Sequence, residues 1–409
     1  ENKMQPMKLY FDVRDVFRAP RLALSGKKII LFTQANLAGY FAYWILNYLG
    51  AMVNGMSFTD AWSLYGLYPC LLEMEALSLF PCVLFWIGVV VWFYAISLGA
   101  TAVSRVTYRQ LKGDEFYSGS DAWNYVKKHW HPIIYSSVSL ILILAFLFII
   151  AGIFGLLGKI PYVGEFLFVF PYLLYFFGSV FTIYTSIVLL VSLIYTPSIV
   201  ATYEEDTMGT VWHNFSITWG QPWRMISYHL VLLPLLIIGG YLFSYFWISG
   251  YELINIVFGH DFFMGTKLMK IVGWASQAVH PEALCSLIGN NCSICSVCSS
   301  GCLSCGSILS ANVVDLSGTE QITAYVMVIF LFLIMISAVS YAMSILAVGE
   351  TLMFIIFKNR TDNDNILEKD DEDDIDNDTN DDLDNEEFVN DIDDNIDSDD
   401  NETANNNSD

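Results

Sequence analysis

The sequence predicts an all-α fold: a polytopic membrane bundle of six transmembrane helices, arranged as three hairpins, with interfacial helices and a disordered C-terminal tail. Three observations favour this class. The 409 residues are 55% apolar and only 15% charged, whereas soluble proteins carry about 25% charged residues. The apolar residues lie in long uninterrupted runs. The acidic charge is gathered at one end, because residues 359–409 hold 23 of the 42 Asp and Glu residues.

A helix needs about 20 apolar residues, at about 1.5 Å rise each, to cross a bilayer. Six stretches without Asp, Glu, Lys or Arg reach this length: Ile29–Val53, Ala76–Ser104, Ile133–Gly158, Phe166–Tyr203, Met225–Tyr251 and Gln321–Gly349. Each is too long for an ordinary core helix. The fourth is long enough for one span plus a re-entrant or interfacial turn near Thr196 and Pro197.

Basic residues in the connections predict the orientation, because cytoplasmic loops carry an excess of Lys and Arg. Seven basic residues precede the first span: Lys3, Lys8, Arg14, Arg18, Arg21, Lys27 and Lys28. Five more lie between the second and third spans, whereas residues 54–75 contain none. We therefore expect an integral, multi-pass protein of an inner or plasma membrane, with both termini in the cytoplasm.

These features divide the chain into three parts. Residues 1–28 form a cytoplasmic, N-terminal interfacial helix. Residues 29–357 form the six-helix transmembrane domain, which includes a non-cytoplasmic, cysteine-rich loop over 259–320. Residues 358–409 form a disordered acidic tail, because this composition cannot bury enough apolar surface to fold alone.

A repeated spacing indicates how the spans are grouped. The second span ends in Thr101–Tyr108 and the fourth in Thr196–Tyr203, and the sixth ends similarly in Thr351 and Phe357-Lys358. Each of the first two is followed by a polar elbow and a segment with two Trp residues seven positions apart, namely Trp123 and Trp130, then Trp212 and Trp219. Seven positions are two helical turns, so each pair should share one helix face, as suits a membrane interface. We interpret the pattern as three repeated helical hairpins.

The segment leading into the fifth span extends this pattern. It is Thr210–Arg224, with the sequence TVWHNFSITWGQPWR. Together with Arg14–Lys28 and Ser340–Arg360, it resembles a loose group of uncharacterised multi-pass membrane proteins. That group includes the membrane domain found beside glycerophosphoryl diester phosphodiesterases. The resemblance covers most of the body but neither the cysteine-rich loop nor the tail. It implies a helical membrane domain of unknown activity, and no catalytic residue carries over.

Six of the eight Cys residues lie between the fifth and sixth spans: Cys285, Cys292, Cys295, Cys298, Cys302 and Cys305. The run from Cys292 to Cys302 has the spacing of a bacterial ferredoxin cluster, but the Pro that normally follows is Leu303. Two Cys-x2-Cys pairs are also a zinc-binding pattern, with an unusually short separation here. Disulfides are the third interpretation. Thiols oxidise on the non-cytoplasmic side, so the predicted orientation favours disulfides, with a metal at Cys292, Cys295, Cys298 and Cys302 as the alternative.

Ionisable side chains inside a span are functional candidates. Glu350 is the strongest, because a bare carboxylate at this depth is costly and requires a partner or a proton. Arg105 and His229 are candidate partners at similar depth, and Gln34 and Asn36 add amides in the first span. These five residues line a polar path under a functional interpretation. Under a structural one, they form hydrogen bonds between helices.

The sequence contains no HExxH, GxSxG, Walker or GxGxxG motif, so it supplies no enzyme mechanism and predicts no cofactor. The acidic balance argues against nucleic-acid binding, which needs Lys and Arg to neutralise phosphates. The predicted partners are the lipid bilayer and a protein that binds the acidic tail or the cysteine-rich loop. We expect a non-enzymatic scaffold or regulator of a membrane partner. The alternative is a transporter or channel for a small solute, ion or lipid that uses the carboxylate of Glu350.

Overall fold

The computed structural model describes residues 7–71, 78–279, 316–362 and 365–368. Every regular element in these ranges is a helix. Six of the helices are long and apolar enough to cross a membrane: α3 (Gly26–Val53), α5 (Leu79–Lys112), α7 (Trp130–Leu157), α9 (Tyr172–Tyr203), α11 (Pro222–Phe258) and α15 (Gly318–Asp362). They coincide with the six apolar stretches of the sequence, so the six-span, all-α prediction is confirmed.

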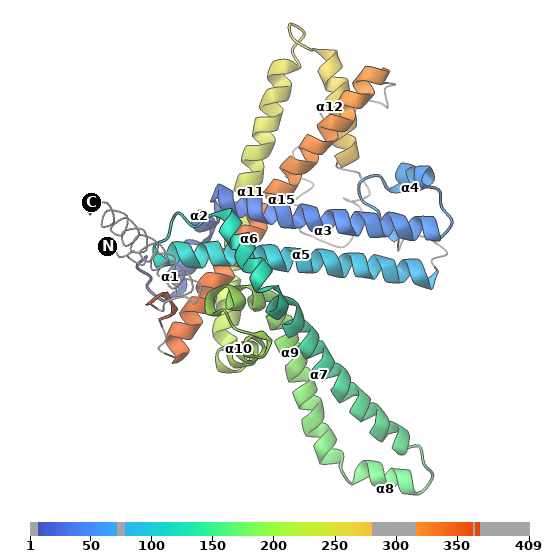
Figure 1. Ribbon diagram of the computed structural model, residues 1–409, viewed down its shortest axis with the longest axis vertical. Helices are drawn as coiled ribbons and strands as arrows, with labels where there is room; N and C mark the ends of the chain where they lie inside the picture. Colours follow the sequence, from blue (N-terminus) through green and yellow to red (C-terminus); the bar gives the residue numbers. More distant parts are fainter. Residues whose placement is uncertain (1–6, 72–77, 280–315, 363–364, 369–409) are drawn as a thin grey trace, which may run out of the picture.

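The six helices form three hairpins, α3–α5, α7–α9 and α11–α15, which diverge from a common centre (Figure 1). A short helix lies in the far connection of each hairpin: α4 (Phe58–Tyr65), α8 (Val163–Val169) and α12 (Thr266–Val279). Four short helices surround the near ends: α1 (Val13–Val16), α2 (Ala19–Ala23), α6 (Gly119–Lys128) and α10 (Thr207–Gly220). We call this centre the hub, meaning these four helices and the near ends of the six spans.

The hub is built on the second helix of each hairpin. Helices α5, α9 and α15 contact one another in all three pairs, and the remaining spans pack outside them. The threonines that mark the repeat, Thr101, Thr196 and Thr351, are all buried at these crossings. Each hairpin therefore has the same order: a short hub helix, a span, a short outer helix and a second span. The three-hairpin arrangement is confirmed.

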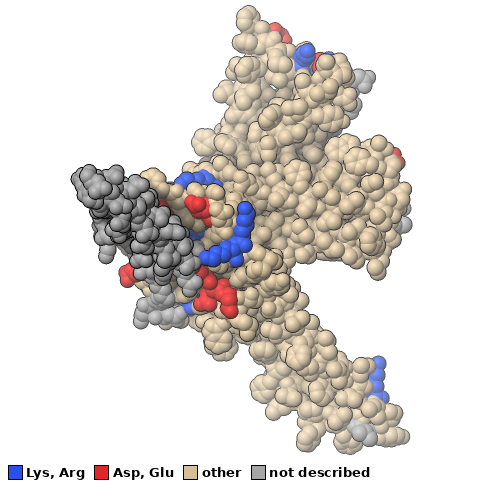
Figure 2. All heavy atoms as spheres, viewed as in Figure 1, with Lys and Arg blue, Asp and Glu red and all other residues tan. Residues whose placement is uncertain are grey.

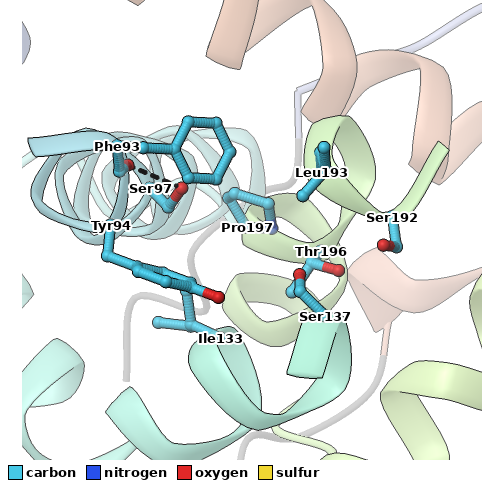
Figure 3. A pocket seen from close by; sticks show the side chains of 9 residues that line it. All are labelled: Phe93, Tyr94, Ser97, Ile133, Ser137, Ser192, Leu193, Thr196 and Pro197. Carbon is cyan, nitrogen blue, oxygen red and sulfur yellow. Dashed lines mark hydrogen bonds between the residues drawn. The ribbon is translucent and has the colours of Figure 1, made fainter. Parts of the chain in front are cut away.

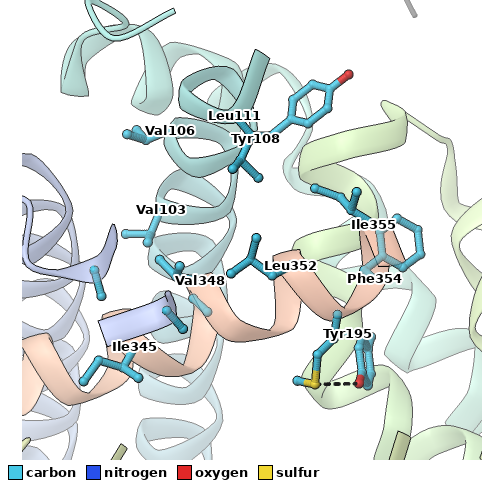
Figure 4. Close-up of a cluster of buried hydrophobic side chains, with 14 of the residues drawn as sticks. Val103, Val106, Tyr108, Leu111, Tyr195, Ile345, Val348, Leu352, Phe354 and Ile355 are labelled. Carbon is cyan, nitrogen blue, oxygen red and sulfur yellow. Dashed lines mark hydrogen bonds between the residues drawn. The ribbon is translucent and has the colours of Figure 1, made fainter. Parts of the chain in front are cut away.

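Helix α15 contains the longest unbroken run of buried residues among the six spans. Residues 347–358 are all buried in succession, so this part of α15 is covered on every side, as a helix at the centre of a core must be. Figure 4 shows Val348 and Leu352 of α15 packed beside Val103 of α5, with Tyr195 of α9 nearby. The outer parts of the hairpins are different, since their apolar side chains are mostly exposed.

Tyrosines of α3 hold the outer connection of the first hairpin. The hydroxyls of Tyr40, Tyr43 and Tyr48 donate to the backbone oxygens of Leu67, Pro69 and Gly66, at 2.5, 2.6 and 2.6 Å. The Tyr68 hydroxyl donates to Val279 O of α12 at 2.8 Å and so joins the first and third hairpins. Burial raises the pKa of Tyr68 to about 12, so the hydroxyl keeps the proton that it donates.

Charged side chains gather at the hub. Apart from Lys159, Lys267 and Lys270, all the Lys and Arg side chains that the structure describes belong to the hub. Figure 2 shows them where the hairpins meet, while the arms are almost free of charge on this face. Residue 7 and the end of α15 both lie in the hub, so the two ends of the described chain are at the same end of the spans.

Several details differ from the expectations. Residues 13–23 form two short helices rather than one interfacial helix, and Asp15, Val16, Ala19 and Ala23 are buried because α15 and α11 cover them. Helix α9 runs through Pro197 without a turn, and the break lies at its other end, before Tyr172. Proline is tolerated inside membrane helices such as α9 because neighbouring helices and Ser or Thr side chains can satisfy the freed backbone groups.

The tail also begins later than residue 358. Helix α15 continues to Asp362, and a 3-10 turn follows at Ile366–Glu368. Ile366 and Leu367 are 1% and 5% exposed and belong to the main core cluster. Two adjacent apolar side chains are enough to anchor this turn, although the sequence around them is acidic.

The paired tryptophans behave differently in the two repeats. Trp212 and Trp219 share α10 and are 74% and 79% exposed, as the spacing predicts. Trp123 lies in α6, whereas Trp130 begins α7, so this pair does not share a helix. The chain bends at His129, between them, and this bend ends α6.

Close packing between α3 and α5 depends on glycine. A Cβ at Gly99 would lie 2.5 Å from the Ala35 Cβ, whereas a Cβ at Gly178 of α9 would meet nothing within 4 Å. We expect Gly99→Ala to destabilise the protein by about 1 to 3 kcal/mol through overpacking. Gly178→Ala should be neutral or stabilising, because alanine favours a helix. The midpoint of thermal unfolding in detergent, followed by tryptophan fluorescence, measures both. Equal midpoints would contradict this account of the contact.

Candidate functional site in the hub

Arg105 forms the central ion pair of the hub. Its Nη2 lies 2.6 Å from Oε1 of Glu204, and the two side chains are 0% and 7% exposed. Its Nη1 donates to Ala201 O at 3.1 Å, and its guanidinium lies 4.1 Å from the centre of the Tyr125 ring. The pair joins α5 to the end of α9. A buried pair with further donors and a ring contact is a strong but local constraint.

Glu204 is also the residue that ends α9. Its φ is +56°, in the left-handed region that usually takes glycine. A non-glycine residue costs about 1 kcal/mol or more there, and it persists where its surroundings fix it. The Arg105 contact supplies that constraint. Asp206 then begins α10 by accepting a hydrogen bond from the Gly209 N–H at 2.8 Å. The ion pair therefore sets the elbow between the second and third hairpins.

The elbow between α5 and α6 is built in another way. Helix α5 ends at Gly113, with φ +103°, and Ser118 and Asp121 form a reciprocal capping box that begins α6. Tyr117, in this elbow, lies under Arg109, whose guanidinium carbon is 5.5 Å from the ring centre. Burial raises the pKa of Tyr117, and the positive charge of Arg105 opposes that rise.

Glu350 lies apart from Arg105. It is 4% exposed, in the enclosed part of α15, and its Oε1 has no hydrogen-bond partner among the described residues. The pairing of Arg105 with Glu350 that the sequence suggested is absent, because the Arg105 guanidinium is directed to Glu204. Glu350 is instead close enough to Tyr195 for an electrostatic interaction. The Tyr195 hydroxyl also contacts Met353 Sδ at 4.0 Å, drawn in Figure 4.

His229 approaches the same tyrosine from α11. The His229 and Tyr195 rings are 5.7 Å apart between centres, in an edge-to-face arrangement. Nδ1 of His229 lies 2.9 Å from Met225 O, while Nε2 is buried with no partner in the part of the chain that the structure describes. Tyr195 is thus the common neighbour of Glu350 and His229, and it comes from a third helix.

The two amides of the first span serve other contacts. Gln34 accepts a hydrogen bond from Trp123 Nε1 of α6 at 2.8 Å. Asn36 donates to Ser340 Oγ of α15 at 3.2 Å. Of the five residues proposed for a path, Gln34, Asn36 and Arg105 therefore have intramolecular partners, each in another hairpin or in the short helix that precedes one.

Hydroxyl groups form a second set of contacts between helices, which the sequence did not indicate. Ser198 of α9 and Thr351 of α15 are 3.4 Å apart between their hydroxyl oxygens. Asn214 of α10 donates to Thr196 Oγ1 at 3.1 Å, and Ser136 of α7 lies 3.5 Å from the same oxygen. Serine and threonine are ordinary in helices, so only the alignment of the three repeats at threonine could have indicated these positions.

A small depression lies where α5, α7 and α9 meet (Figure 3). It has no room for a water molecule, and its polar lining comes from Tyr94, Ser97, Ser137, Ser192 and Thr196. Pro197 has no N–H, so the Leu193 carbonyl in the same lining lacks its usual helical donor. No Asp, Glu, Lys, Arg or His lines the depression.

The six clustered cysteines, Cys285 to Cys305, lie outside the described residues, as do most of the tail's acidic groups. Cys70 and Cys82 have free thiols. Among the residues that the structure does describe, no group of three or more His, Cys, Asp or Glu side chains is arranged to hold a metal ion. The choice between disulfides and a metal in the cysteine-rich loop stays a sequence prediction.

The ion pair predicts a large loss of stability when the carboxylate of Glu204 is removed. We expect Glu204→Ala to destabilise the protein by about 3 to 5 kcal/mol, because it removes the carboxylate from a buried pair. Glu205→Ala is the matched control: its side chain is 36% exposed and lies 3.4 Å from His213, so its loss should cost about 0 to 1 kcal/mol. Thermal unfolding in detergent compares them, and similar midpoints would contradict the central place of the pair.

For Glu350 we expect a substitution to raise stability rather than lower it. Glu350→Gln keeps the shape of the side chain but removes a carboxylate whose Oε1 is buried without a hydrogen-bond partner, so we expect a gain of about 1 to 3 kcal/mol. Glu165→Gln, on the exposed helix α8, should leave the unfolding midpoint unchanged. A clear loss of stability in Glu350→Gln would show that the carboxylate has a favourable partner.

Comparison with known proteins adds no relative to this picture. No protein-family model matches the chain, and neither the curated proteins nor the solved structures contain a significant match. The functional argument therefore rests on the geometry of the hub.

Proposed function

We propose that this chain is a non-enzymatic integral membrane protein that organises or regulates a partner in the membrane. One observation carries the proposal: polar side chains near the hub bind from one hairpin to another, or to the short helix that precedes it. Gln34 joins α3 to α6, Asn36 joins α3 to α15, and Arg105 joins α5 to α9. Such contacts keep three arms in a defined relation, which is what a scaffold requires.

The arms supply surface for a membrane partner. In α7 and α11, only 6% of the most apolar window is buried within the protein. Helices in lipid associate through shape and hydrogen bonds rather than through the hydrophobic effect. The outer parts of these arms are therefore available to lipid or to the spans of another protein.

The charge distribution supports the orientation in this proposal. The hub carries nearly all the described Lys and Arg residues, and such residues favour the cytoplasmic side. On this basis both termini and the acidic tail are cytoplasmic, in an inner or plasma membrane, and the cysteine-rich loop is on the opposite side. A protein partner then has two contact points, the tail and that loop.

A transporter or channel is the second candidate, and Glu350 is the observation in its favour. A carboxylate that is 4% exposed and close to Tyr195, which itself contacts His229, is an unusual group to keep in a span. Flux through liposomes tests this alternative directly, because Glu350→Gln should abolish flux if the carboxylate lines a path.

Affinity purification in mild detergent tests the scaffold. The full chain is compared with a version that stops after Glu368, because an earlier stop at Arg360 would remove the buried Ile366 and Leu367. We expect a near-stoichiometric protein with the full chain and its loss with the truncated one. A partner held equally by both would move the contact to the cysteine-rich loop or the spans. No partner with either would contradict the scaffold and favour the flux experiment.

A further inference from the structure

The end of the described chain is fastened to a basic surface. Tyr108 of α5 donates its hydroxyl to Ile366 O at 3.3 Å, and Ile366 and Leu367 are buried in the core cluster. Arg360 donates to Phe11 O at 2.9 Å and to Asp12 Oδ1 at 2.8 Å. The chain therefore leaves the hub at Glu368 from a fixed position, next to the N-terminal segment and the end of α5.

That surface has a defined composition, and we call it the basic face. It consists of residues 7–28 and 105–128, which contain 11 Lys and Arg residues against five Asp and Glu. Hydrogen bonds hold the two segments together: Met7 N to Leu111 O at 2.8 Å, and Lys28 Nζ to Gln110 Oε1 at 2.9 Å. The exposed basic side chains are Lys8, Arg14, Arg21, Lys27, Lys127 and Lys128.

Four of its five acidic residues have local partners. Asp12 binds Arg360, and Asp15 is buried beside Arg18 at 3.6 Å. Asp114 accepts from the Phe116 and Tyr117 N–H groups, and Asp121 belongs to the capping box of α6. Glu115 is the fifth. The net charge of the face is therefore positive, and its exposed groups are mainly basic.

The segment that follows Glu368 has the complementary charge. Residues 369–409 contain 20 Asp and Glu and one basic residue, Lys369. We propose that this acidic segment binds the basic face of its own hub. A coil of this length spans roughly 35 Å on average, so the tether holds its carboxylates near the face at millimolar effective concentration. The contact is electrostatic and does not require the segment to fold.

If the tail binds the basic face, external ligands of either one must compete with this internal contact. A basic partner that binds the tail must displace it from Lys127, Lys128 and their neighbours, and an anionic headgroup that binds the face must do the same. The inference does not depend on the proposed scaffold, because the two charges are properties of one chain.

Carbodiimide cross-linking of the full chain in discs of neutral phosphatidylcholine tests the contact. The reagent joins lysine to a carboxylate that touches it, and mass spectrometry locates the products. We expect cross-links from residues 370–409 to Lys8, Lys27, Lys127 or Lys128, which weaken strongly when the salt is raised from about 0.15 to 1 M and the screening length falls from about 8 to 3 Å. No tail cross-link in neutral discs would overturn the proposal and leave the face to lipid or to a partner.

A pair of matched variants gives a second readout. A protease that cuts at Asp should cleave the tail of Lys127→Gln/Lys128→Gln about threefold faster than that of the wild type, because two exposed contacts are lost. Lys267→Gln/Lys270→Gln changes two exposed lysines of α12, at the far end of a hairpin, and should leave the rate unchanged. Equal rates in all three proteins, or equal acceleration in both variants, would contradict the proposal. A partner lost in the purification experiment would not alter either result.

Discussion

The complete enclosure of α15 between residues 347 and 358 is the constraint on which the structure depends. Helices α2, α3, α5, α9 and α11 all contact α15, so the three hairpins are held together mainly by the last span. A leucine side chain is solvated as well by lipid hydrocarbon as by the surface of another helix. The outer arms therefore gain little from packing against one another, and they diverge. The specific association is concentrated at the hub, where shape, glycine contacts and hydrogen bonds act together.

Polar groups have a consistent place in this arrangement. Gln34, Asn36, Arg105 and Thr351 each contact an element outside their own hairpin. In an apolar medium such bonds are difficult to replace, which suits them to fixing the relation between arms. Glu350 is different, because its Oε1 is buried without a hydrogen-bond partner among the described residues. This contrast is the physical reason to separate a structural set of polar residues from a single candidate for function.

The sequence predicted the features that depend on local composition. Run length and hydropathy located all six spans, and the Thr-to-Tyr spacing located the three hairpins. It did not predict the features that depend on contacts between distant parts of the chain. Nothing in the local pattern showed that Arg105 pairs with Glu204 rather than with Glu350, because the choice depends on how α5 crosses α9. The bend at His129 places Trp123 and Trp130 on different helices. The two apolar residues Ile366 and Leu367 are buried, so the folded part of the chain extends beyond the predicted start of the tail.

The repeat also explains why the hub is asymmetric. Aligning Thr101, Thr196 and Thr351 makes Gly99 equivalent to Gly349, and each glycine meets the first helix of its own hairpin: Gly99 contacts Ala35 of α3, and Gly349 contacts Leu232 of α11. The same alignment makes Glu350 equivalent to Tyr195, its neighbour across the hub, and to Ala100. Equivalent positions from three hairpins thus lie in one interior. The repeats have the same helical arrangement there, but their side chains differ. A change at such a position alters one contact without altering the hairpin plan. This is how a repeated membrane fold can acquire an ionisable group at one of three equivalent positions.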